Sequence, residues 1–524
     1  MQSLARLLAA ASCALALAAP AAAQTVSRAP TRVVTADQSA PTTPRDRMAD
    51  FSIGSDYPGT LIRDDSLAQL RTLQDELAFR YIRFHDIFHD DLGTYREVDG
   101  RPVYDWTRID YLYDRLLAMG LKPFIEVGWS PDAMRTTDQT IFYWQGNVSH
   151  PDPVKWDGLV DAFVRHLIER YGIEEVRTWY FEFWNEPNLD GFWGGADQAA
   201  YFAYYGRTAR IIKAIDPALR VGGPATAGAA WVPEFIAYAD QHDLPIDFIA
   251  THTYGVEGGF LDEFGEGDNK MSRDFNAVVS DVQKVRAEIE ASSRPGLPLF
   301  FTEWSTSYNP RDPIHDDYIG AAYIVDRMRR VEGIVQGMSY WTYSDLFEEP
   351  GPQTRAFDGG FGLMTPDGIR KATWFAYKYL NSLGDAELPA GDEQAIVALD
   401  GDTLQVLAWT YSGPPAQDVS NRPFFRRVRP AAEAAPVRID FAGLAPGAHE
   451  VKVRRVGFRN NDAYTAYLEM GRPEKLTAEQ IATLNALSED EPVMQTVQIG
   501  ADGRGSLTLP MLEGDVVLVE VTAS

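Results

Sequence analysis

The sequence predicts a (β/α)8 TIM barrel followed by a C-terminal β-sandwich domain. Three observations lead to this fold class. Short apolar segments alternate with amphipathic helical segments about eight times over roughly 330 residues. After Gly384 the pattern changes to short strand-like runs separated by turns. Two of the apolar segments also end abruptly on a glutamate, as barrel strands do where they carry an active site.

We divide the 524 residues into four parts according to composition and periodicity. The parts are a signal peptide (1–23), a linker or N-terminal arm (24–47), the catalytic barrel (48–384) and an accessory β-sandwich (385–524). Within the arm, residues 32–35 are expected to add one short strand to the sheet of another domain. We interpret the sandwich as a scaffold that packs on the barrel rather than as a separate carbohydrate-binding module.

The N-terminus has the charged, apolar and small-residue order of a secretory signal peptide. Arg6 precedes an apolar run, and three alanines precede Gln24. We therefore expect cleavage after Ala23 and a periplasmic or secreted protein. The single cysteine, Cys13, would be removed with this segment. A lipoprotein acylated at Cys13 is the alternative, but only about three apolar residues precede the Ala-Ser-Cys sequence.

Charge and composition exclude several classes of partner. The formal net charge of −27 argues against binding to nucleic acid or to an anionic membrane, whereas a neutral sugar polymer is compatible with it. Outside the N-terminal segment, no apolar run reaches the roughly 18 residues of a membrane helix. No set of His, Cys and carboxylate residues has metal-ligand spacing, and no phosphate-binding loop is found. We therefore expect neither a metal nor a cofactor.

The predicted barrel elements follow one another in a regular order. The eight strands are residues 51–56, 81–88, 122–129, 178–186, 220–227, 248–254, 298–304 and 337–345. The helices are residues 65–77, 106–119, 153–171, 198–215, 273–291, 317–331 and 371–383. A doubly wound sheet would also alternate, but no Gly-rich turn follows the first strand. Glu186 thus ends strand four and Glu303 ends strand seven.

The region after Gly384 is predicted to be all-β with one helical interruption. Its strands are residues 395–399 and 404–409, which form a hairpin, and 437–441, 449–456, 496–499, 506–509 and 516–521. Residues 477–480 have the sequence of a capping box and predict a short helix.

The two glutamates at the strand ends indicate glycosidic bond hydrolysis. A retaining glycosidase needs one carboxyl group that protonates the leaving oxygen and one carboxylate that attacks the anomeric carbon, about 5 to 5.5 Å apart. Strand ends four and seven on one barrel rim can supply this pair. In this interpretation Glu186 is the general acid and then the base, and Glu303 is the nucleophile. A solvated surface charge is the alternative, but both glutamates follow buried aromatic strands.

Other polar residues at strand ends are candidate sugar contacts. Asn185, beside the acid, is placed to bond the 2-hydroxyl of the sugar. His252 and Tyr254 end strand six on one face, so we expect His252 to orient Glu303 or a hydroxyl and Tyr254 to contact the nucleophile. His85 ends strand two and is a candidate for a sugar hydroxyl. The alternative for both histidines and Tyr254 is a buried core position in which hydrogen bonds satisfy their polar atoms.

Aromatic residues are frequent near the predicted rim. They are Trp129, Phe192, Trp193, Trp304 and Tyr308. Sugar C–H faces pack on aromatic rings, so some of these side chains could form a platform, while others would belong to the core.

Four runs of the sequence resemble glycoside hydrolase family 39, the family of β-xylosidases and α-L-iduronidases. They are YIRFH (81–85) followed by DDLGTY (90–95), FWNEPN (183–188), TEWSTSYNPRD (302–312) and WTYSDLFEE (341–349). The second run is shared by several barrel glycosidase families, whereas the third and fourth look specific to the xylosidase branch. The resemblance extends over residues 48–384 and into the sandwich.

This resemblance implies a set of functional residues. They are Glu186 as acid/base, Glu303 as nucleophile, and His85, Asn185, His252 and Tyr254 as contacts to the sugar. It also implies a glutamate in the loop after strand eight, where Glu348 and Glu349 both fit and Glu349 is slightly favoured. The chain departs from the family at Asp86, where a small residue is expected. That carboxylate would contact substrate or bind a neighbouring backbone group.

The resemblance implies a retaining exo-β-1,4-xylosidase that releases xylose from the non-reducing ends of xylooligosaccharides and also cleaves aryl β-xylosides. One alternative is another family 39 glycosidase, such as an α-L-iduronidase, which would need a basic residue for the sugar carboxylate. The sequence offers no clear one. The other alternative is a non-catalytic sugar-binding protein, for which two adjacent, mutually repelling carboxylates would have no purpose.

Overall fold

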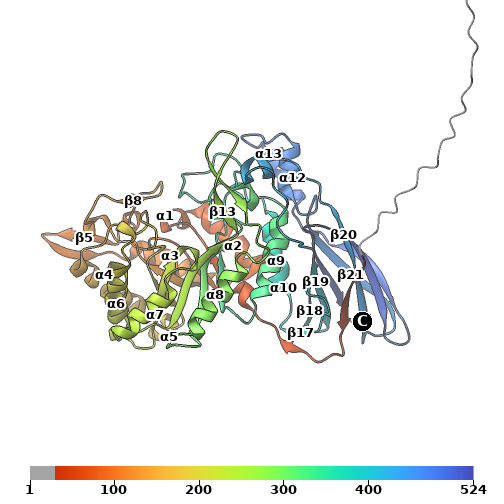
Figure 1. Ribbon diagram of the computed structural model, residues 1–524, viewed down its shortest axis with the longest axis horizontal. Coiled ribbons are helices and arrows are strands. Elements are labelled where there is room, and N and C mark those ends of the chain that lie inside the picture. Colours follow the sequence, from red (N-terminus) through yellow and green to blue (C-terminus); the bar gives the residue numbers. More distant parts are fainter. Residues whose placement is uncertain (1–29, 523–524) are drawn as a thin grey trace, which may run out of the picture.

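A computed structural model describes residues 30–522 of the chain. The predicted signal peptide lies outside the described residues. The barrel and the sandwich lie side by side, with the sandwich on the right in Figure 1. Within the described part of the chain, no helix is long and apolar enough to cross a membrane.

Eight parallel strands close into a barrel, which confirms the predicted fold class. In spatial order they are β3 (Ser52–Gly54), β4 (Tyr81–Arg83), β7 (Lys122–Val127), β10 (Tyr180–Phe183), β11 (Arg220–Thr226), β12 (Phe248–Tyr254), β15 (Leu299–Ser305) and β16 (Gly337–Tyr340). Several strands are shorter than predicted at their carboxyl ends. After β16, for example, Thr342 bonds to the backbone of Phe361 and Asp345 to that of Met364, so these residues belong to a loop.

Helices surround the barrel. The long ones are α2 (Asp64–Leu77), α3 (Thr107–Ala118), α4 (Pro153–Tyr171), α6 (Gln198–Ile215), α7 (Val232–Gln241), α8 (Val279–Glu290), α9 (Ile319–Val331) and α10 (Ala372–Ser382), with short α1 (Pro58–Leu61) and α5 (Ile173–Val176). Helix α7 was not predicted, although its buried Val232, Phe235, Ile236 and Ala239 have helical spacing. Helix α8 begins later than the predicted residue 273, because Val278 has a φ of 71° and ends a loop there.

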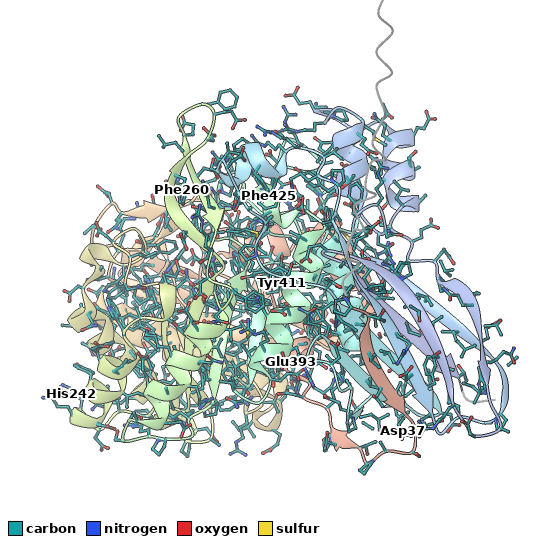
Figure 2. All side chains as sticks on the ribbon, turned by 45° about the vertical axis from the view of Figure 1, so that its right-hand side comes forward. Asp37, His242, Phe260, Glu393, Tyr411 and Phe425 are labelled. Carbon is teal, nitrogen blue, oxygen red and sulfur yellow. The ribbon has the colours of Figure 1, made fainter. Side chains whose placement is uncertain are left out.

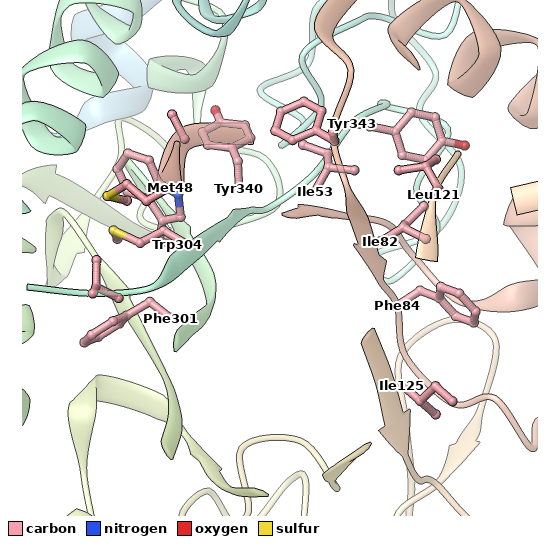
Figure 3. Close-up of a cluster of buried hydrophobic side chains, with 14 of the residues drawn as sticks. Met48, Ile53, Ile82, Phe84, Leu121, Ile125, Phe301, Trp304, Tyr340 and Tyr343 are labelled. Carbon is pink, nitrogen blue, oxygen red and sulfur yellow. The ribbon is translucent and has the colours of Figure 1, made fainter. Parts of the chain in front are cut away.

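Apolar side chains from both layers fill the space between strands and helices. Figure 3 shows Ile53, Ile82, Ile125 and Phe301 among them. Inside the barrel, a second cluster closes the end at which the strands begin. It consists of Phe51, Phe124, Phe248, Ala250 and Phe300, with Tyr81 and Tyr180 packed against it. The barrel is therefore accessible only at the carboxyl ends of its strands.

Two sheets form the second domain around a separate apolar core. One contains β1 (Arg32–Asp37), β20 (Glu433–Ala442) and β23 (Gly505–Leu512). The other contains β2 (Thr43–Pro44), β17 (Ala386–Leu388), β18 (Ala395–Asp400), β19 (Thr403–Trp409), β24 (Val516–Thr522), β21 (Gly447–Val456) and β22 (Val493–Ile499). Strand β1 pairs in parallel with β20, so the arm adds a strand as predicted. The capping box at Thr477 is present and begins α13 (Ala478–Ala486).

Three small hairpins extend from the barrel. They are β5 (Tyr95–Val98) with β6 (Arg101–Tyr104), β8 (Thr140–Ile141) with β9 (Gly146–Asn147), and β13 (Val256–Leu261) with β14 (Gly267–Met271). Two further short helices, α11 (Asn421–Phe425) and α12 (Ala463–Glu469), belong to the second domain. Figure 2 shows Phe425 of α11 beside the hairpin that carries Phe260. Asn421 accepts a hydrogen bond from the Met271 backbone and donates one to Asp312, so the second domain supports this hairpin.

Candidate active site

A buried arginine organises the floor of the site. Arg83, at the end of β4, is 0% exposed. Its guanidinium donates hydrogen bonds to Glu182 Oε2 (2.5 Å), Glu303 Oε1 (2.8 Å) and Asn185 Oδ1 (2.9 Å), and it lies 3.0 Å from Glu126 Oε2. Burial alone would lower the pKa of Arg83, but these carboxylates raise it, so the side chain stays charged.

No role was predicted for Arg83, although it lies in the run YIRFH (81–85). The two-residue period of a strand could have indicated one. Arg83 and His85 are two residues apart and therefore face the same side of the strand. Since His85 was predicted to contact a sugar hydroxyl, Arg83 should face the interior of the barrel as well.

Glu186 follows β10 on a turn in which its own φ is 44°. Its backbone N–H bonds to the carbonyl of Ala225, and its Oε1 lies 2.9 Å from His252 Nδ1. Burial raises the pKa of Glu186 to about 7, although the positive charges of His85 and Arg83 act to lower it. A carboxyl group that holds its proton up to neutral pH is suited to general acid catalysis.

Glu303 lies on β15 opposite Glu186. Arg83 donates to its Oε1, and the Tyr254 hydroxyl donates to its Oε2 at 2.8 Å. These bonds orient the carboxylate and stabilise its negative charge. One oxygen of Glu186, one oxygen of Glu303 and a nitrogen of His252 all lie within 4.8 Å of one another. This spacing fits a retaining carboxylate pair and is shorter than the roughly 6.5 Å or more that an inverting pair needs.

His252 contacts a different partner from the one predicted. Its Nδ1 lies 2.9 Å from Glu186 Oε1 but 3.5 Å from Glu303 Oε2, so it orients the acid rather than the nucleophile. Burial lowers the pKa of His252 to about 4, which leaves the ring neutral. Tyr254, in contrast, makes the predicted contact with Glu303. The sequence placed both residues at the correct strand end but did not determine how each ring is directed.

His85 links two further carboxyl groups. Its Nδ1 lies 2.8 Å from Glu126 Oε2, and its Nε2 lies 3.2 Å from Glu349 Oε1. Burial alone would lower the pKa of His85, but Glu126 and Glu349 raise it well above its usual value. Burial also raises the pKa of Glu349 to about 8. Glu348 points elsewhere and pairs with Arg63 at 2.6 Å, so Glu349 is the glutamate of this loop that reaches the site.

A cleft of about 710 Å³ opens at this end of the barrel. The predicted site residues that line it are His85, Asn185, Glu186, Tyr254, Glu303 and Glu349. Of the predicted rim aromatics, Phe192 and Tyr308 line the cleft, together with Phe142, Trp341 and Phe361. Trp129, Trp193 and Trp304 are each 0% exposed and belong to the core. Trp341 was not predicted as a site residue, although it directly follows the eighth strand, β16.

Comparison with known proteins agrees with this geometry. A profile described as "Glycosyl hydrolases family 39" matches residues 32–506. The chain belongs to glycosyl hydrolase family 39. It is 36% identical to a "Beta-xylosidase" of Geobacillus stearothermophilus over 90% of this chain and 92% of that protein.

Two solved structures are similar over nearly their whole length. A monomeric beta-xylosidase from Caulobacter crescentus CB15 is 60% identical, with a TM-score of 0.91 over 94% of this chain and 99% of that one. The GH39 enzyme from Xanthomonas axonopodis pv. citri is 54% identical, with a TM-score of 0.93 over 95% of this chain and 98% of that one. The predicted family is thus confirmed, and this family 39 member is a glycoside hydrolase.

Asp86 lies where the family resemblance implies a small residue. Its side chain contacts the backbone and does not line the cleft. Its Oδ1 accepts a hydrogen bond from the Trp129 N–H at 3.1 Å, and the residue is absent from the cleft lining. Burial raises the pKa of Asp86 to about 7. Of the two roles considered for this carboxylate, the structure favours the backbone contact.

Within residues 30–522, one group of side chains has ligand atoms close enough together to share a metal ion. It consists of Glu186, His252 and Glu303. Each of the three already contacts another residue of the site, since His252 bonds to Glu186 and Glu303 bonds to Arg83 and Tyr254. Hydrogen bonding within the protein accounts for the arrangement of these side chains.

Proposed function

We propose that this family 39 enzyme is an exo-acting β-1,4-xylosidase that releases xylose from the non-reducing ends of xylooligosaccharides with retention of configuration. The observation that carries this proposal is the carboxyl pair, in which Glu186 and Glu303 meet within 4.8 Å and Glu186 has its pKa raised to about 7. The two similar proteins described as beta-xylosidases support the choice of xylose as the sugar.

In the first step, an oxygen of Glu303 attacks the anomeric carbon and the bond from that carbon to the leaving oxygen breaks. Glu186 transfers its proton to the leaving oxygen, so that the shortened oligosaccharide departs as a neutral alcohol. The product is a xylosyl ester of Glu303. Arg83 and Tyr254, which bond to the two oxygens of this carboxylate, direct it toward the sugar.

In the second step, Glu186 is ionised and acts as a base. It removes a proton from a water molecule, the water oxygen attacks the anomeric carbon, and the bond to Glu303 breaks. Xylose leaves, Glu186 again carries a proton and Glu303 is again a carboxylate. His252, neutral and 2.9 Å from Glu186, keeps this carboxyl group in position through both steps.

The remaining predicted residues serve to bind the xylose unit. Arg83 holds Asn185 through its side-chain oxygen, which leaves the amide nitrogen free to donate to the 2-hydroxyl. His85 and Glu349 form a buried polar pair at the edge of the cleft and are suited to bond other hydroxyls. Such bonds position the sugar for attack by Glu303.

The charged groups of the cleft argue against an α-L-iduronidase and against a non-catalytic sugar-binding protein. Among the residues that line it, all from the described part of the chain, no lysine or arginine is present to bind a uronic acid carboxylate. An α-L-iduronidase activity is therefore disfavoured. A non-catalytic binding role would not explain a carboxyl group with a raised pKa next to a carboxylate held by an arginine.

Hydrolysis of para-nitrophenyl glycosides tests the proposal. We expect the β-xyloside to be cleaved with a much higher kcat/KM than the α-arabinoside, the β-glucoside or the α-iduronide. A higher rate on the α-iduronide or the β-glucoside would overturn the choice of sugar. From xylotetraose, the first products should be xylose and xylotriose, with the original reducing end in the xylotriose, and two xylobiose molecules as the first products would contradict exo action.

We further propose that the enzyme acts outside the cytoplasm in the breakdown of xylan fragments. The support is the order of residues 1–23 as a signal peptide. N-terminal sequencing of the protein from periplasm and culture medium should find Gln24 as the first residue. Recovery of the full-length chain from the cytoplasm would contradict this proposal.

A further inference from the structure

Two groups of residues line the cleft beside the carboxyl pair. One is the buried polar pair of His85 and Glu349, which suits the xylose unit. The other comes after Glu186 in the chain and includes Gly228 and Asn188, whose side chain bonds to the backbone of Ala227. Because Glu186 delivers its proton to the leaving oxygen, we place the departing sugar beside this second group. The residues there consequently select the leaving group.

One charged side chain near this second group has no part in the mechanism described above. Asp281 lines the cleft and lies on α8, whose Lys284 bonds to the backbone of Ala229, next to Gly228. The Thr253 hydroxyl donates to its Oδ2 at 2.5 Å, and Thr253 directly follows His252, the residue that holds Glu186. The other oxygen, Oδ1, forms no hydrogen bond within residues 30–522. Asp281 is therefore fixed by one oxygen and free to accept hydrogen bonds with the other.

No cation neutralises Asp281 within the described part of the chain. Lys284, one turn further along α8, donates to the backbone carbonyl of Ala229 (2.8 Å) and pairs with Glu288 (3.4 Å). Neither Lys284 nor any arginine lines the cleft. The negative charge of Asp281 therefore adds to that of the carboxylate pair rather than being balanced locally.

We propose that Asp281 determines the leaving-group specificity of this enzyme. Its free oxygen accepts hydrogen bonds from the hydroxyls of a neutral xylose unit, and its charge repels a leaving group that carries a carboxylate. The enzyme should thus act on unsubstituted xylooligosaccharides and reject a bond whose departing xylose bears a uronic acid. This inference rests on the proposed xylosidase function and adds the substrate class of its leaving-group side.

Two β-xylosides whose leaving phenols are similar in size but differ in charge test this proposal. They are 4-carboxyphenyl β-xyloside, which is anionic, and 4-carbamoylphenyl β-xyloside, which is neutral. We expect the wild type to prefer the neutral compound. Asp281→Asn removes the charge and keeps a hydrogen-bond acceptor, so it should raise the anionic-to-neutral ratio of kcat/KM by about five-fold or more at low salt. The gain should shrink in high salt because ions screen the repulsion.

Asp281→Ala removes the acceptor as well. It should raise the KM for xylobiose about ten-fold, a loss that Asp281→Asn avoids in large part. Glu290→Gln is the matched control, because it removes one charge from α8 about 14 Å further along the helix axis. It should leave the ratio of the two aryl xylosides unchanged.

An unchanged ratio in Asp281→Asn, or an equal change in Glu290→Gln, would overturn the proposal. A wild type that cleaves neither aryl β-xyloside would instead contradict the proposed xylosidase function. In that case the same pair of phenols on the sugar that the enzyme does cleave tests Asp281 in the same way. The two failures are thus distinguishable.

Discussion

The two ends of the barrel are built from the same strands but have opposite chemistry. On β7, Phe124 belongs to the aromatic cluster at the closed end, and Glu126, two residues later, lies in the charged floor of the site. On β10, Tyr180 and Glu182 have the same relationship. Strand residues two apart face the same side, so each strand contributes first to one layer and then to the other.

The difference shows where stability and function reside. At the closed end, rings contact one another, for example Phe51 and Phe300 with centroids 4.8 Å apart. These contacts depend on apolar burial and need no charge. At the open end, Arg83 and the carboxylates around it are buried and must satisfy one another. Substitutions at the two ends should therefore affect different measurements.

The largest effect is expected for Glu303→Ala at the open end. It removes the proposed nucleophile, so kcat on any β-xyloside should fall by about four orders of magnitude or more. The rate of xylose release and the unfolding temperature should be measured together. A protein that folds normally and keeps a near-normal rate would remove Glu303 from this role.

Glu186→Ala should reduce activity according to the leaving group. For xylobiose, which needs protonation, the loss should be about 10²- to 10⁴-fold. For 2,4-dinitrophenyl β-xyloside, whose phenolate leaves without a proton, the first step should slow far less. Equal losses on the two substrates in steady-state and burst kinetics would contradict the acid assignment.

The pH dependence of kcat/KM in the wild type tests the role of Glu186 as an acid in a second way. The proton of this group is lost as the pH rises through its pKa of about 7. The kcat/KM for xylobiose should therefore fall above about pH 7, and this limb should be absent in Glu186→Ala. A limb that persists in the variant would assign it to another group.

Phe300→Ala at the closed end should lower the free energy of unfolding by about 3 to 5 kcal/mol, because it leaves a cavity in the aromatic cluster. The kcat of the fraction that remains folded should change little. Denaturant unfolding and active-site titration measure the two quantities. A large loss of kcat at unchanged stability would show that the two ends are coupled rather than separate.

The smallest effects compare two neighbours in one loop. Glu349→Ala removes a group that lines the cleft and contacts His85, so kcat/KM should fall about ten- to a hundred-fold. Glu348→Ala removes only the partly exposed pair with Arg63, and kcat/KM should change less than about five-fold. A larger loss in Glu348→Ala would reverse the assignment of the two glutamates.

Much of this architecture was predictable from the sequence because it depends on local patterns. The alternation of apolar strands and amphipathic helices predicted the barrel. The helical period could also have identified α7, and the strand period could have identified Arg83. The two strand-end carboxylates could be named because a strand that ends on a glutamate places that side chain at the rim.

The sequence by itself therefore determined the barrel, the sandwich and the strand-end positions of Glu186 and Glu303, since these follow from short-range periodicity. The tertiary structure decided which groups meet. Arg83 bonds to Glu182 and Glu303, which are 99 and 220 residues away, and His252 turns to Glu186 rather than to Glu303. Such choices depend on the directions of side chains from separate strands, which no local pattern encodes. For the same reason, only the fold shows that Asp281 faces the cleft.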